Sequence, residues 1–93
     1  MIEFEWDPGK AVVNRTKHGV TFEEAQTIFG DPFELMIGDP DHSEGEFRFL
    51  SVGRSSAGRI LVVAYTERQS NKIRIISART ASQAEKSQYE PRH

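Results

Sequence analysis

Six arginines lie on or near three apolar runs in the second half of the chain, and they are the residues best suited to bind an anion. A guanidinium stays protonated in proteins, and its planar fork of donors matches two oxygens of a phosphate or a carboxylate. Near the predicted turns, an ion pair with the acidic N-terminal half is the simpler explanation. That explanation applies best to Arg59 and Arg68. The arginines are Arg48, Arg54, Arg59, Arg68, Arg74 and Arg79.

Lys17 and His18 form a second candidate group, directly before Gly19 at the end of a predicted helix. The helix macrodipole favours cations at this position, so both side chains also have a purely structural explanation. An imidazole and an ammonium placed together at one end of a sheet can, however, transfer protons. The sequence leaves both interpretations open.

Tyr65, in a predicted central strand, is suited either to stack against a base or to remain a partly buried core tyrosine.

The segment "KHGVTFEEA" resembles the turn of a helix-turn-helix, but Glu23 and Glu24 would then face DNA phosphates, which repel them. Specific DNA reading by this segment is therefore disfavoured.

The acidic loop from Asp39 to Glu46 does not have the pattern of a metal site. Counted as a calcium loop, it has Glu44 where glycine is required and Leu50 at the position of the bidentate glutamate. A zinc site would need further histidines or cysteines at short spacing, and the chain has no cysteine. We expect no metal and no other cofactor.

Charge is distributed unevenly along the 93 residues. Up to Glu46 there are eleven acidic and three basic residues, and after it three acidic and nine basic residues. A basic half in a protein of net charge −2 suggests an anionic partner for one face. The acidic N-terminus and the absence of a long apolar run predict a cytoplasmic protein with no membrane contact.

The hydrophobic pattern predicts one α+β domain over residues 1–93, with the order β-α-α-β-β-β-β-α. A small antiparallel sheet would carry two N-terminal helices on one face. Strict alternation puts Arg48 and Arg54 on a common face, but Arg74 and Arg79 on opposite faces unless Ser77–Ala78 forms a bulge. The expected strands are 2–6, 33–38, 47–54, 59–68 and 72–80, and the expected helices are 8–17, 21–30 and 81–90.

Several motifs, in order and spacing, resemble the BrnT toxin family of bacterial type II toxin–antitoxin systems. They are W-D-x-x-K, N-x-x-K-H-G-V, F-E-E-A, G-E-x-R-F and I-S-A-R, and the resemblance extends from Phe4 to about Glu90. It implies a RelE-like fold and a ribonuclease that halts translation. It also implies a BrnA-like ribbon-helix-helix antitoxin as the partner, with DNA contacted only indirectly through that antitoxin.

Carried onto this sequence, the family's basic residues fall on Lys17, His18, Arg48, Arg54 and Arg79. Metal-independent RNA cleavage needs phosphate stabilisation and proton transfer. We assign Arg54 and Arg79 to the scissile phosphate with Arg48 in support, and His18 or Lys17 to proton transfer.

Three further residues complete the candidate set. Glu46 is a weaker candidate for the base. Tyr65 and Arg74 join Arg48 as candidate RNA contacts, although a carboxylate of this protein or of its antitoxin is an alternative anion for Arg74. The alternative function is a toxin-like binding module or regulatory subunit without catalysis.

Overall fold

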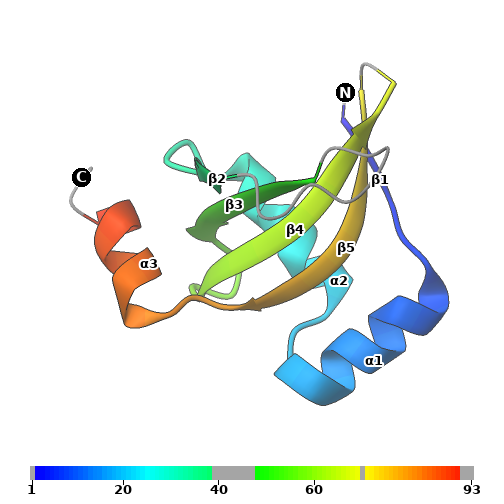
Figure 1. The fold of residues 1–93 in the computed structure, drawn as a ribbon, viewed down its shortest axis with the longest axis horizontal. Helices are drawn as coiled ribbons and strands as arrows, with labels where there is room; N and C mark the ends of the chain where they lie inside the picture. The colour runs from blue at the N-terminus through cyan, green and yellow to red at the C-terminus, as the bar shows by residue number, and fades with distance from the viewer. Residues whose placement is uncertain (1, 39–47, 70, 91–93) are drawn as a thin grey trace.

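The computed structural model describes residues 2–38, 48–69 and 71–90 as one five-stranded sheet with helices packed against it (Figure 1). Neighbouring strands follow the order β1-β5-β4-β3-β2. No helix in these ranges is long and apolar enough to cross a membrane. The strands are β1 (Glu3–Glu5), β2 (Leu35–Gly38), β3 (Phe49–Arg54), β4 (Ile60–Arg68) and β5 (Lys72–Thr80).

The sheet is mixed, which corrects the expectation of a purely antiparallel sheet. Strands β2 to β5 pair antiparallel with their sequence neighbours, as the short connections from β3 to β4 and from β4 to β5 require for those pairs. Strand β1 instead pairs in parallel with β5, with Phe4 opposite Ile73. Alternation along a strand identifies its buried face but not its neighbour, so the first strand's place beside the last could not be deduced from its pattern.

The first helix, α1 (Pro8–His18), has the predicted caps. The Asp7 carboxylate accepts a hydrogen bond from the Gly9 N–H at 2.7 Å, and Gly19 ends the helix with a left-handed φ of 70°. Lys17 and His18 therefore do lie in its last turn.

The second predicted helix is divided into a short α-helix, α2 (Phe22–Ala25), and a 3₁₀ helix, η1 (Gln26–Gly30). Thr21 caps α2, but the Glu24 side chain does not complete the predicted capping box, because it binds Ser55 and Arg59. The Thr27 hydroxyl donates to the Glu24 carbonyl at 2.6 Å, a local bond that competes with regular helix geometry.

The sheet has a hydrophobic cluster on each face. Leu61, Val63 and Tyr65 of β4 face α1, α2 and η1, and we call this side the helical face. Val62 faces the other way and packs with Tyr89 of the last helix, α3 (Gln83–Tyr89), so we call that side the α3 face. The two N-terminal helices share one face, as predicted, and α3 lies on the opposite one (Figure 1).

Asn14 connects α1 to the edge of β5. Its side chain is 5% exposed, donates to the Ala78 and Val20 carbonyls at 2.8 and 2.9 Å, and accepts from the Ala78 N–H at 3.0 Å. The amide thus replaces a neighbouring strand at Ala78, beyond the point where β1 ends. All three backbone groups would be unsatisfied without it.

Replacing Asn14 with alanine should therefore destabilise the protein by about 2–4 kcal/mol, since buried unpaired donors and acceptors are left behind. The free energy of unfolding, measured by urea denaturation, tests this. Thr16→Ala, an exposed position on the same helix, is the control. A loss no larger than that of the control would contradict the role of the amide.

Candidate functional site

A β-bulge in β5 decides which arginines share a face. Ala64 lies opposite Ser77 and Tyr65 lies opposite Ile75, so Ile76 is an extra residue in β5. Residues on both sides of the bulge, Ile75 and Ala78, belong to the same core on the helical face.

Arg74 and Arg79 therefore both lie on the α3 face, and the expectation from strict alternation is wrong. The extra residue, Ile76, precedes the Ser77–Ala78 step at which a bulge was considered. Arg54 is two residues after Val52, which belongs to the cluster on the α3 face, so its side chain is on that face too. Arg48 is two residues before Leu50, which packs against the same cluster, and is on the α3 face for the same reason. The four arginines of the candidate set thus share one side of the sheet.

Arg79 already holds a carboxylate in this structure. Its Nη1 and Nη2 donate to the two oxygens of Glu85 at 2.7 and 2.9 Å, a bidentate pair. These hydrogen bonds, opposed by burial and supported by Ser82, lower the pKa of Glu85 to about 2. Glu85 also accepts from the Ser82 N–H at 2.8 Å and so completes the capping box of α3.

Arg54 lies beside a second carboxylate, that of Asp31. Its backbone N–H donates to Asp31 Oδ2 at 2.8 Å, and the Tyr89 hydroxyl donates to the same oxygen. Burial raises the pKa of Asp31, but these bonds and one from the Phe33 N–H outweigh it, so the net shift is downward. The exposed Arg54 guanidinium donates to the Gly58 carbonyl at 3.4 Å.

The remaining arginines with resolved partners are held by carboxylates of the N-terminal half. Arg74 Nη1 lies 3.2 Å from Glu5, the kind of partner predicted as its alternative anion. Arg68 lies 3.8 Å from the same glutamate, and Arg59 binds Glu24, as expected for arginines near turns. The hydrogen bond from Arg59 to Glu24 is the main reason that the pKa of that carboxyl is lowered.

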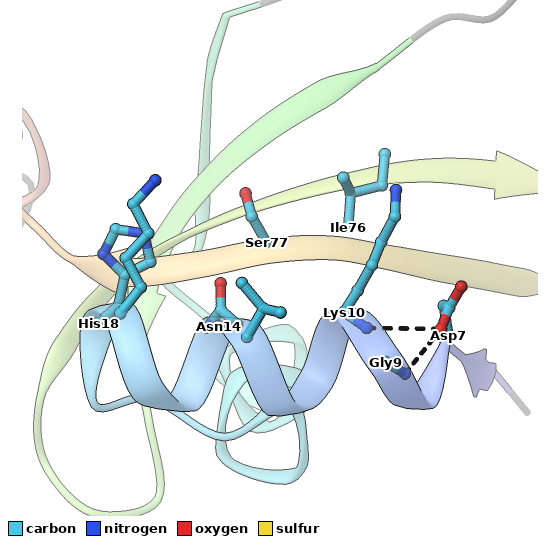
Figure 2. A pocket seen from close by; sticks show the side chains of 9 residues that line it. Asp7, Gly9, Lys10, Asn14, His18, Ile76 and Ser77 are labelled. Carbon is cyan, nitrogen blue, oxygen red and sulfur yellow. Dashed lines mark hydrogen bonds between the residues drawn. The ribbon is translucent and has the colours of Figure 1, made fainter.

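Lys17 and His18 line a different feature, an open pocket of about 550 Å³ between α1 and β5 (Figure 2). Lys10 lines it from the opposite end of α1, and Ile76 and Ser77 of the bulge line it from β5. The side chains of Lys10, Lys17 and His18 are all exposed. The bulge thus contributes to the pocket and also places the arginines on the α3 face.

The structure does not gather all the predicted catalytic residues in one cavity. Neither Arg54 nor Arg79 is among the residues that line the pocket of Lys17 and His18. The connection between the two groups is β5 itself, because Ser77 of the pocket lies two positions before Arg79. Glu46 and the acidic loop 39–46 lie outside the described residues.

Tyr65 is a core residue, which removes it from the candidate RNA contacts. It is 3% exposed, its hydroxyl is 2.9 Å from Ser51 Oγ, and its ring packs against Phe29 and Phe49. Burial raises its pKa, because the phenolate would be poorly solvated. A ring that faces the helices inside the core is not available to stack on a base.

Sequence reasoning missed Asn14 and Glu85. Asn14 stands in the motif N-x-x-K-H-G-V, but a polar residue between exposed ones gives no signal of burial. Glu85 had a signal, since Ser82 three positions earlier completes the S-x-x-E pattern of a capping box. Within the described residues, no group of three or more histidine, aspartate or glutamate side chains could hold a metal ion.

Two comparisons bear on this arrangement. The family model for "ribonuclease toxin, BrnT, of type II toxin-antitoxin system" matches residues 6–85. The crystal structure of the Brucella abortus ribonuclease toxin BrnT is similar in fold, with a TM-score of 0.67 and 24% sequence identity. That match covers 89% of this chain and all of the Brucella chain. No curated protein sequence matches.

The depressed pKa of Glu85 makes a prediction for acid unfolding. The pKa is about 2 in the folded protein against an ordinary value of 4.5, so the stabilisation is complete above about pH 4.5 and is lost as the pH falls towards 2. In Glu85→Gln, unfolding free energy should therefore fall less steeply over this range. Urea titrations at several pH values measure it.

Glu90→Gln, at the exposed C-cap of the same helix, is the matched control for this measurement. The control should follow the unsubstituted protein at each pH. Parallel pH profiles for Glu85→Gln and the unsubstituted protein would show that the Arg79–Glu85 pair does not contribute to stability.

Proposed function

Because the chain belongs to the BrnT family of ribonuclease toxins, we propose that it cuts RNA without a metal ion and thereby inhibits translation. The observation that carries this proposal is the common face of Arg54, Arg74 and Arg79, which the bulge in β5 produces. Arginine forks on one side of a sheet suit a phosphate backbone, which presents its oxygens in a row.

The reaction uses the 2′-hydroxyl of the substrate as nucleophile. The 2′-oxygen forms a bond to the adjacent phosphorus, the bond to the 5′-oxygen breaks, and the products are a 2′,3′-cyclic phosphate and a 5′-hydroxyl. One proton leaves the 2′-oxygen and one is delivered to the 5′-oxygen. Negative charge develops on the phosphoryl oxygens between these events, and fixed cations stabilise it.

Arg79 and Arg54 are the proposed ligands of the scissile phosphate. Arg48, expected in support, is six residues from Arg54, about 20 Å along an extended strand, so it would contact another phosphate of the same RNA. For Arg79 this requires that a phosphate take the place of the Glu85 carboxylate on the same two nitrogens. Both anions present oxygens that fit the fork, so the exchange needs no new donor geometry. Lys17 or His18 would transfer protons from the pocket beside Ser77, and Glu46 stays a weaker candidate for the base.

The proposed partner is a BrnA-like ribbon-helix-helix antitoxin that neutralises the toxin and contacts DNA in its place. The family description, which specifies a type II toxin–antitoxin system, supports an antitoxin in general. A RelE-like fold and a site of action in the cytoplasm belong to the same proposal.

Two observations favour the alternative, a toxin-like module without catalysis. The arginine group and the Lys17–His18 pocket are distinct in this structure, and Arg79 is held by Glu85. A module that only binds its partners would tolerate both features. Cleavage of RNA separates the two functions.

Purified protein incubated with a defined RNA in EDTA should release fragments that end in 2′,3′-cyclic phosphate. Arg54→Ala and Arg79→Ala should each slow cleavage about 10²–10³-fold, the usual effect of losing one donor to the developing charge. Product ends and rates are measured on gels, with translating ribosomes added in a second series. Intact RNA in both series would overturn the ribonuclease.

Glu85→Gln is the matched control for Arg79→Ala, because each substitution breaks the same ion pair. If Arg79 acts on phosphate, Glu85→Gln keeps or raises the cleavage rate while Arg79→Ala loses it. Equal losses in both variants would show that only the ion pair matters. Arg15→Ala, an exposed α1 residue outside the pocket, should cut at the normal rate.

A further inference from the structure

Two buried polar side-chain atoms in the described part of the chain have no hydrogen-bond partner. They are Nε of Arg48 and Oγ1 of Thr66. Thr66 as a whole is only 3% exposed. Buried donors of this kind are costly, and nearly all of them in folded proteins are satisfied. Neither atom is used by the fold or by the proposed chemistry.

Both atoms lie in one row across the α3 face. Tyr65 is on the helical face, so the next residue, Thr66, is on the α3 face. Thr66 pairs with Arg74 of β5. On the other side of β4, Phe49 pairs with Tyr65 in the antiparallel register. The residue before Phe49, Arg48, therefore lies opposite Thr66. The threonine hydroxyl thus lies between two arginines from the flanking strands.

Among the described residues, several cations gather at the end of the sheet that holds this row. Glu5, opposite Arg74, lies 3.2 Å from Arg74, 3.8 Å from Arg68 and 4.0 Å from Lys72, and Glu3 lies 3.9 Å from Lys72. Arg74 therefore shares Glu5 with other cations, and Arg48 adds a further positive charge on the other side of Thr66. An additional anion would be stabilised here.

We propose that Arg48, Thr66 and Arg74 form a binding site for a phosphate of the RNA backbone, separate from the scissile phosphate. The inference rests on the proposed function, because it takes RNA as the ligand. A carboxylate is satisfied by a single arginine fork, as Glu85 is by Arg79. Donors from three neighbouring strands suit the several oxygens of a tetrahedral phosphate better.

The location also fits a substrate that extends along the sheet. Arg48, directly before β3, and Arg54, its last residue, are six residues apart, which corresponds to about 20 Å along an extended strand. RNA with its reacting phosphate near Arg54 and Arg79 would reach the Thr66 row with a phosphate further along the chain. The row would then hold the substrate in register and take no part in the chemistry.

The test is the affinity for a short 2′-O-methyl RNA oligonucleotide, which lacks the attacking hydroxyl and cannot be cut. Thr66→Val, which keeps the shape of the side chain and removes the hydroxyl, should weaken binding about tenfold. Arg48→Met should weaken it and lower the slope of log K against log salt by about 0.7. Thr66→Ser should bind normally, as should Thr80→Val at an exposed position of β5.

Thermal unfolding of Thr66→Val provides a second readout. Because Oγ1 has no partner in the free protein, the substitution should leave the melting temperature unchanged or raise it. Normal RNA affinity of Thr66→Val, or a melting temperature several degrees lower, would overturn the site. Weak binding by Thr66→Val alone, in a protein that fails to cut unmodified RNA, would support the site and overturn the proposed reaction.

Discussion

The hydrogen bonds of Asn14 to the edge of β5 are the interaction on which the rest of the site depends. Strand β1 pairs with only the first three residues of β5, so the remaining outer edge needs another partner. The Asn14 amide supplies it at Ala78, two residues after the bulge, and fixes α1 against the strand. The pocket of Lys17 and His18 exists because this contact holds the helix beside Ser77.

The charge asymmetry of the sequence becomes internal pairing when the chain folds. Carboxylates from the acidic half reach cations of the basic half across the sheet, as Glu5 does for Arg74 and Glu24 for Arg59. Arg59, Arg68 and Arg74 therefore each have a carboxylate partner within the chain, and the simpler explanation offered for Arg59 and Arg68 is correct. Arg48, directly before β3, is the member of the set whose Nε is buried without a hydrogen-bond partner.

Local features of the sequence predicted the elements well, and long-range features did not. Caps at Asp7 and Gly19 defined α1, and the run from Lys72 to Thr80 has the predicted bounds of β5. A period of two carries no information on which strand lies beside β1 or where a bulge reverses the alternation. The burial of Tyr65 likewise depends on rings that are distant in the chain, so both of its interpretations were open.

Glu85 couples the candidate site to the last helix. Its carboxylate binds the fork of Arg79 and also accepts from the Ser82 N–H, so one side chain serves both an ion pair and a helix cap. A phosphate that takes the fork leaves Glu85 with the cap alone, and the free energy of binding is reduced by the ion pair that is lost. If RNA binds here, as we propose, its affinity is the difference between the interactions of a phosphate and of Glu85 with the same guanidinium. Such an exchange favours a ligand that contacts several cations at once over a single phosphate. Only such a ligand gains more free energy from its contacts than is lost with the Arg79–Glu85 ion pair.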